Sequence, residues 1–327
     1  MFNIETYLDS LPEDTEEINV SDKGLTNLDV TRFKNLKKLC CGYNQLTSLH
    51  LNENLQTLYC HNNQLTSLHL NKKLEYLNCG YNQLTSLHLN ENLQTLYCYN
   101  NQLTSLHLNE NLQTLYCGYN QLTSLQLNEN LQTLYCHNNQ LTSLDLNEKL
   151  QKLCCDNNLL TSLESKNLQN LDCFKNQLTF LYLNKELKEL NCVKNQLTSL
   201  HLNEKLQKLY CGYNQLTSLD TKNLKHLCCN NNQLTSLHLN KELKEIIYYH
   251  NPICDIIQHS SVIIIKQKLQ VLNQFRFLYY CLKFKKQFRD LLWVKIREPK
   301  IRMKYSHNYL VKHLHEETDL DELLENW

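Results

Sequence analysis

A near-identical segment, LTSLHLNENLQTLYC, recurs along most of the chain and constrains the fold more than any other feature. Cys41 marks the first clear copy and Cys229 the last, and eight of the ten intervals between them are 19 residues, the other two 18. Short-period repetition of this kind is typical of solenoids, in which each turn contacts only its neighbours. The phase extends back to Val20 and on to Tyr248, which predicts about 13 turns with degenerate outer copies acting as end caps.

One turn, residues 55–70, reads LxxLxCxxNxLxxLxL, which resembles the leucine-rich repeat with Cys in its third apolar position. The resemblance covers residues 18–258 and predicts a β-rich solenoid with short turns of 18–19 residues and a parallel sheet on its concave face. About ten residues lead from Leu65 to the next strand, which is too short for a helix with two turns. The outer side should therefore be extended, and the Leu49-His50-Leu51 steps could form a second parallel ladder there.

Within a turn, Leu58 and Cys60 alternate with Tyr59, so the two apolar residues should face inward and the tyrosine outward. Leu65, Leu68 and Leu70 are expected to close the core from the other side. The resemblance implies that the Asn three residues after each Cys points inward and bonds to the backbone of its own and adjacent turns, because buried backbone groups need partners. The expected ladder comprises Asn44, Asn63, Asn82, Asn101, Asn120, Asn139, Asn158, Asn176, Asn195, Asn214, Asn232 and Asn251.

Two rows of possible metal ligands run along the repeats. The inward Cys row places one thiol per turn, which makes a line and not the converging tetrahedron that zinc needs, so we interpret it as small buried hydrophobes. The outer row His50, His69, His88, His107, His201 and His238 is interpreted as solvated positions that duplicated together, although a metal or pH-sensing ladder is the alternative. We therefore expect no metal site, no catalytic residue and no cofactor.

The outward strand positions and those just after them are rich in Tyr, Thr, Asn and His, and from about residue 152 they become more varied and charged. Tyr offers large contact area with one polar end, which suits protein recognition; the alternative is that stacked Tyr only support the sheet. A partner is expected where the turns differ, because identical turns cannot fix its register. The predicted partner-binding residues are Tyr59, Tyr76, Tyr97, Tyr99, Tyr116, Tyr135, Lys152, Asp172, Phe174, Glu189, Lys208 and Tyr210.

The two ends depart from the repeat. Residues 1–17 are expected to form an N-terminal cap with a short helix ended by Pro12. Residues 259–315 form a basic segment with helical spacing, interpreted as a helical C-terminal cap, and residues 316–327 an acidic tail. The basic segment also suggests an alternative function, association with nucleic acid or an anionic membrane.

Lys+Arg and Asp+Glu each number 33, which disfavours a uniformly basic nucleic-acid binder. No apolar run is long enough for a transmembrane segment, and the first residues do not look like a secretory signal. The 16 Cys are therefore interpreted as thiols in a reducing, intracellular compartment.

The predicted function is a non-enzymatic scaffold that binds a protein partner on the concave face. A third, less favoured reading is a ubiquitin-ligase-like effector with Cys254 or Cys281 as nucleophile; bacterial leucine-rich repeat effectors have such activity, through a much larger C-terminal domain. The Asn-rich, Ala-free composition and the string LWVKIREPKIRMKYSHNYLVKHL resemble leucine-rich repeat proteins of giant DNA viruses of amoebae. That resemblance implies a host protein as partner and the host cytoplasm as location; the oligomeric state is left open.

Overall fold

The computed structural model describes residues 3–255, 261–284, 294 and 298–300. The chain divides into two compact units, residues 1–266 and 267–327. The acidic tail expected at 316–327 and most of the basic segment after Lys283 lie outside the described residues.

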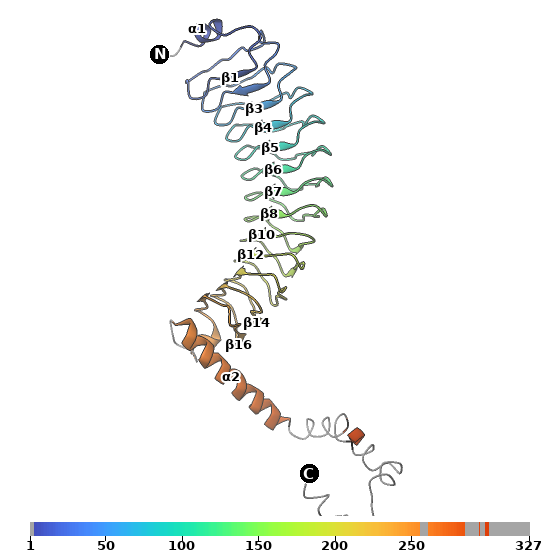
Figure 1. Cartoon of the computed structure of the whole chain (residues 1–327), viewed down its shortest axis with the longest axis vertical. Helices are drawn as coiled ribbons and strands as arrows, with labels where there is room; N and C mark the ends of the chain where they lie inside the picture. The colour runs from blue at the N-terminus through green and yellow to red at the C-terminus, as the bar shows by residue number, and fades with distance from the viewer. Residues whose placement is uncertain (1–2, 256–260, 285–293, 295–297, 301–327) are drawn as a thin grey trace, which may run out of the picture. The chain divides into compact units, whose positions relative to one another are not determined.

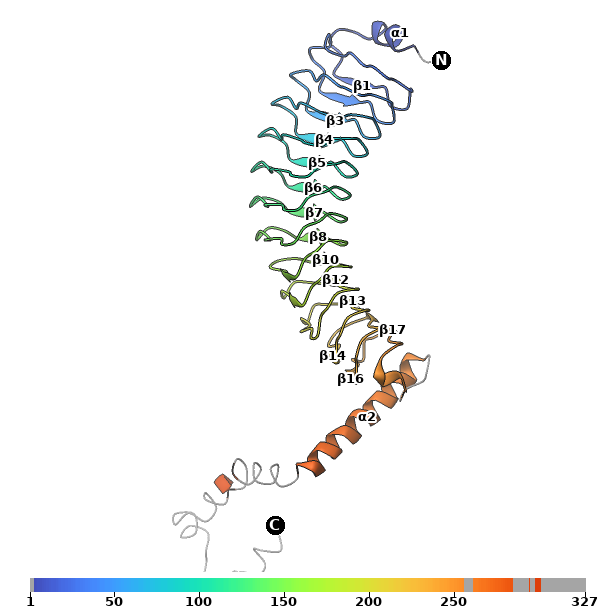
Figure 2. The ribbon, with the colours of Figure 1, turned by 180° about the vertical axis from the view of Figure 1, so that it is seen from behind.

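The first unit is built around one parallel sheet of 13 strands, each three residues long and hydrogen-bonded to the strand of the preceding turn. The strand order from β1 to β17 gives twelve complete turns between the first strand and the last. Figures 1 and 2 show the strands following one another along the solenoid. The solenoid predicted from the repeat is confirmed. The strands are β1 (Glu17–Asn19), β2 (Lys38–Cys40), β3 (Thr57–Tyr59), β4 (Tyr76–Asn78), β5 (Thr95–Tyr97), β6 (Thr114–Tyr116), β7 (Thr133–Tyr135), β8 (Lys152–Cys154), β10 (Asn170–Asp172), β12 (Glu189–Asn191), β13 (Lys208–Tyr210), β15 (His226–Cys228) and β17 (Glu245–Ile247).

Equivalent residues of successive turns stand directly beside one another. Thr95 pairs with Thr114, Leu96 with Leu115 and Tyr97 with Tyr116, and the same register holds along the sheet. The middle Leu of nearly every strand and the Cys that follows the strand are fully buried, whereas the first and third strand residues face outward. Each fully buried Leu contributes roughly 1.5–3 kcal/mol, which no turn can gain alone because its apolar edges are covered only by its neighbours.

The outer side of the solenoid differs in part from the sequence prediction. Leu70 is only half buried. Within the described ranges the expected outer ladder forms at two places, where β9 (Ser162–Glu164) pairs with β11 (Phe180–Tyr182) and β14 (Ser218–Asp220) pairs with β16 (Ser236–His238). Both pairs begin in the 18-residue turns. Their missing residue removes the usual Leu-Asn step, and a buried Ser165 or Thr221 stands there instead and accepts the backbone N–H of the next turn's Asn through its hydroxyl.

The Asn that follows each strand joins two turns through both ends of its side chain. Asn120, for example, is buried and donates from Nδ2 to the carbonyls of Cys98, one turn back, and Cys117, in its own turn, at 3.0 and 3.1 Å. Its Oδ1 accepts the N–H of Leu103 at 2.9 Å. These contacts recur from Asn44 to Asn251, so in each repeat the Cys carbonyl accepts from two asparagines and one N–H beyond the strand ladder is paired.

A second Asn ladder, which the sequence analysis did not identify, runs along the outer side. Asn109 donates from Nδ2 to the carbonyls of Asn90 and Leu93 in the preceding turn, at 2.5 and 2.9 Å, and Asn128 makes the same bonds to Asn109 and Leu112. The signal was present in the repeated LNEN string, whose first Asn supplies this row. Most turns are therefore joined to the next at both edges, and the outer row is interrupted where Ser165 and Thr221 replace the Asn.

Helices close both ends of the first unit. Helix α1 (Ile4–Asp9) lies in the expected N-terminal cap; the side chain of Asn3 caps its start, and Asp9 pairs with Arg32 at 2.7 Å. A 3₁₀-helix, η1 (Pro252–Asp255), ends the repeats, and α2 (Val262–Lys283) follows. In the first turn of α2, Ile265 is buried and Lys266 Nζ donates to the carbonyls of Lys241 and Leu243, both at 2.9 Å, which caps the last turn.

Replacing one Asn of the inner ladder should destabilise the solenoid strongly. Asn120→Ala leaves the buried Leu103 N–H without a partner and removes one of the two asparagine donors to each of the Cys98 and Cys117 carbonyls, and we expect the free energy of unfolding to fall by about 3 kcal/mol. Urea denaturation followed by circular dichroism measures the change. The control is Asn111→Ala, which removes one exposed bond to the Glu91 carbonyl and should cost less than about 0.5 kcal/mol. Equal losses in the two variants would contradict this role for the inner ladder.

Candidate functional site: the outward face of the sheet

The first and third residues of the sheet strands form one continuous surface, here called the sheet face, and most of the residues predicted to bind a partner lie on it. Tyr99 and Phe174 lie just beyond their strands, at its edge. The tyrosine rings stack along the third positions: Tyr97 and Tyr116 are 4.5 Å apart between ring centroids, and Tyr116 and Tyr135 are 4.3 Å apart with planes 6° from parallel. Burial in this stack, with Tyr135 alongside, raises the pKa of Tyr116 to about 12. These rings support one another whether or not a partner binds.

The tyrosine row is interrupted in the middle of the sheet, and the interruption forms a groove. After Tyr135 the third strand position holds Cys154, Asp172 and Asn191 before Tyr210 restores the ring. The smaller side chains leave a hollow of about 450 Å³ over strands β7 to β13. An earlier single gap at Asn78 is closed by Tyr76, whose ring contacts Tyr59 at 4.9 Å and Tyr97 at 5.8 Å.

The groove carries a mixed set of charges. Lys152 is exposed at its edge, whereas Lys208 Nζ pairs with Glu189 at 2.7 Å, which raises the pKa of Lys208. Asp172 accepts hydrogen bonds from the Phe174 N–H and the Asn191 amide, but its burial prevails and raises its pKa. The predicted set contained Tyr135, Lys152, Asp172, Glu189 and Tyr210. Besides the buried leucines of the groove floor, it omitted the outward-facing Cys154, Asn170 and Asn191. The break in the tyrosine row was the available signal for them.

A row of turns borders the sheet face where the strands end. The second residue after each repeat Cys has a positive φ, as at Tyr43, Tyr81 and Tyr119, whose rings are about half exposed. In four places the first residue is Gly, and at three of them the ring of the next turn lies over it. Tyr99, for example, lies over Gly80 and contacts Tyr81 edge-on at 5.4 Å. A Cβ on Gly80 would lie 2.8 Å from the Tyr99 ring, so the Gly is required by the close approach. Because the Gly occurs in every second turn between Gly42 and Gly118, edge-on ring pairs form in alternate turns of this part of the sheet: Tyr43 with His61, Tyr81 with Tyr99, and Tyr119 with His137.

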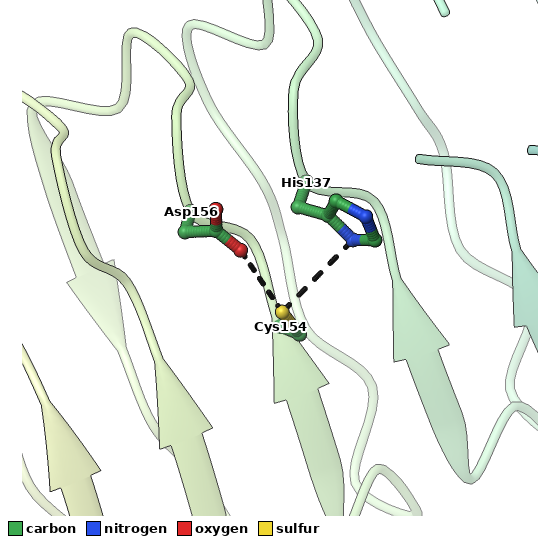
Figure 3. A group of neighbouring side chains, drawn as sticks. All are labelled: His137, Cys154 and Asp156. Carbon is green, nitrogen blue, oxygen red and sulfur yellow. Dashed lines mark hydrogen bonds between the residues drawn. The ribbon is translucent and has the colours of Figure 1, made fainter. Parts of the chain in front are cut away.

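Beside the groove, three side chains of ligand type converge at this edge. His137 follows β7, Cys154 ends β8 and Asp156 follows β8, and one ligand atom of each lies within 4.8 Å of the others (Figure 3). Cys154 Sγ donates to Asp156 Oδ1 at 3.0 Å and lies 4.0 Å from His137 Nδ1. The sequence analysis weighed the inward Cys row and the outer His row separately, and neither row contains this group.

Most of the other thiols in the described part of the chain are buried. In the inward row burial raises the pKa of Cys79 and Cys117 to about 12, so these thiols are protonated packing groups. Cys254, one of the two candidate nucleophiles, donates its Sγ–H to the Tyr248 carbonyl at 3.1 Å, and burial raises its pKa, which is the opposite of activation. The side chain of Cys281 lies outside the described residues.

Comparison with solved structures gives the family. The fold is similar to YopM from Yersinia enterocolitica, with a TM-score of 0.71 and 28% identity over 74% of this chain and 57% of that one. It is similar to YopM from Yersinia pestis, a leucine-rich effector protein, with a TM-score of 0.63 and 30% identity over 72% of this chain and 78% of that one. It is also similar to InlJ from Listeria monocytogenes, whose functional domain includes a cysteine ladder. That comparison gives a TM-score of 0.63 and 30% identity over 72% of this chain and 63% of that one.

The chain therefore belongs to the leucine-rich repeat proteins. It spans less than two thirds of the Yersinia enterocolitica and Listeria chains. No family model and no curated protein matches the sequence. Within the described residues no helix has the length and apolarity needed to cross a membrane. The resemblance to giant-virus proteins stays a prediction.

The close approach at the sheet edge gives a second testable prediction. Gly80→Ala should cost about 1–3 kcal/mol because its methyl group collides with the Tyr99 ring. Adding Tyr99→Ala should remove most of that penalty, so Ala at residue 80 becomes nearly neutral in the Tyr99→Ala background. A double-mutant cycle by urea denaturation measures the coupling. If the losses of stability in Gly80→Ala and Tyr99→Ala simply add in the double variant, the close approach of the Tyr99 ring does not require Gly at residue 80.

Proposed function

We propose that this protein is a non-enzymatic scaffold that binds a protein partner on its sheet face, with the groove between Tyr135 and Tyr210 as the centre of contact. The single observation that carries the proposal is the break in the tyrosine row. Near-copies of one turn would give a uniform aromatic strip, but three successive turns replace the ring with small polar side chains and leave a hollow flanked by tyrosines. Hollows flanked by aromatic rings are where binding energy concentrates in protein interfaces.

The charges around the groove favour a polar protein segment with an acidic group. Lys152 is exposed and forms no ion pair among the described residues, whereas Lys208 is already paired with Glu189. An acidic side chain of the partner would meet Lys152, and an aromatic or aliphatic side chain would fill the space beside Cys154 and Asn191. Asp172 disfavours a second acidic group deep in the groove, which gives the site a polarity along its length.

The cellular compartment of this protein and the source of its partner are part of the same proposal. The fifteen cysteines whose side chains the structure describes are all free, eleven of them in the inward row, which supports a reducing compartment. The resemblance to giant-virus proteins supports a host protein as the partner. The alternative function, nucleic-acid or membrane association, depends on basic residues that mostly lie outside the described part of the chain, and no described contact favours it.

The test fills the groove without disturbing the fold. Asn191→Tyr places inside the groove the tyrosine that other turns carry at the third strand position. The matched control is Asn78→Tyr, at the third position of β4, which lies outside the groove. Each Asn accepts one backbone N–H, from Val193 and Gly80 respectively, so both changes lose that bond. Asn191→Tyr also removes the amide bond to Asp172 Oδ2. The partner is first identified by photo-crosslinking from Tyr210 and is then titrated against each variant.

We expect Asn191→Tyr to weaken partner binding by more than about tenfold, because the groove is the centre of contact. Asn78→Tyr should leave binding within about twofold. Cross-links from an outer position such as His88 that match those from Tyr210, or equal binding by the two variants, would contradict the proposal.

A further inference from the structure

The group His137, Cys154 and Asp156 combines three different metal-ligating side chains on one edge of the sheet face. Their ligand atoms lie within 4.8 Å of one another, and all three residues are partly exposed, so an ion from solvent can reach them (Figure 3). Among the described residues this is the one group of three or more such side chains within that distance. We propose that these three residues form a binding site for a thiophilic divalent cation of the zinc class.

The distances fit that chemistry. Zinc takes tetrahedral N, S and O ligands at about 2.0–2.3 Å, which places neighbouring ligand atoms about 3.3–3.6 Å apart. Cys154 Sγ lies 3.0 Å from Asp156 Oδ1 and 4.0 Å from His137 Nδ1, so small side-chain rotations reach the required geometry. A thiolate with an imidazole selects zinc-class ions, whereas magnesium and calcium prefer oxygen ligands alone.

The repeats themselves supply an independent argument. Two turns with the same backbone place different side chains at the three positions: His61, Asn78 and Gly80 in one, Tyr99, Tyr116 and Gly118 in the other. In the turn after His137, Cys154 replaces the Asn or Tyr of those turns and Asp156 replaces the Gly. Both replacements therefore occur in one turn, directly beside a His. Packing does not require either change, because the sister turns fold with Tyr or Asn and with Gly.

The surroundings hold two of the ligands in place. The His137 ring lies over Gly118 and contacts Tyr119 edge-on at 5.2 Å, and the Asn157 amide donates to Asp156 Oδ2 at 2.7 Å, leaving Oδ1 toward the thiol. Asp172 is engaged by the Phe174 N–H and Asn191, so it is not counted as a ligand. Three protein ligands leave one coordination position of a tetrahedral ion open, and Cys154 also lines the groove.

Cobalt(II) is the probe, because it takes zinc sites and its thiolate bond gives a charge-transfer absorption band. The full chain is titrated with cobalt chloride under reducing conditions, and zinc chloride is then added to displace the probe. We expect one equivalent of cobalt to produce the band and zinc to remove it. A full chain that gives no thiolate band would overturn the proposal.

Variants assign the ligands. Cys154→Ser should abolish the band, and His137→Asn and Asp156→Asn should each weaken cobalt binding more than about tenfold. The controls are His61→Asn, the equivalent histidine of a turn that lacks the Cys and the Asp, and His69→Asn in the outer His row; both should leave the titration unchanged. A band that persists in Cys154→Ser, or that disappears in either control, would assign the thiol or the histidine elsewhere and refute this site.

A stability measurement separates loss of ligand from loss of fold. All three positions face outward, so the variants should unfold at nearly the wild-type temperature without metal. Zinc should raise the unfolding temperature of the wild type but not that of Cys154→Ser. Neither measurement involves a protein partner, so the metal site and the proposed scaffold function stand or fall separately.

Discussion

The flush stacking of the turns depends on asparagine side chains that bond to two turns at once. A turn of 18 or 19 residues has too few residues for a helix on its outer side, so many of its backbone groups lie beyond the strand ladder. Asn120 pairs three of these groups at one edge, and Asn109 pairs two carbonyls at the other. Leucines supply most of the apolar burial, but they are interchangeable between turns. The directional bonds of the asparagines are what fix each copy in register with the next.

That register explains why a substitution in one turn has a predictable place on the surface. Because Tyr97 stands beside Tyr116 and Tyr116 beside Tyr135, a change at the same position of the repeat appears as a step along one row. The groove is three such steps, at Cys154, Asp172 and Asn191, and the His137 group lies at its border. The proposed binding surface and the proposed metal site thus both arise by substitution on a constant framework, and neither requires a change of backbone.

Much of this could be predicted from the sequence, because repetition reports the fold directly. The strands, the inward Leu and Cys, and the Asn that follows each strand all have fixed positions in the repeat. The outer side could not be predicted as well. Leu70 is half buried, and among the described residues the outer strand pairs form where a turn loses one residue and the hydroxyl of Ser165 or Thr221 accepts the N–H of the next turn's Asn. The groove and the convergence of His137 with Cys154 depend on side-chain size and distance between turns, which the repeat pattern alone does not give.

Hydrogen exchange at a single backbone position tests the central claim most directly. The Leu103 N–H lies outside any strand and is paired with the side chain of Asn120, whereas the Cys98 N–H is paired with the backbone carbonyl of Tyr116. If the asparagines hold the turns in register, the Leu103 amide should exchange as slowly as that of Cys98, in the same cooperative opening. Exchange of Leu103 at the rate of an exposed loop amide would show that the asparagine bonds do not hold the stack together.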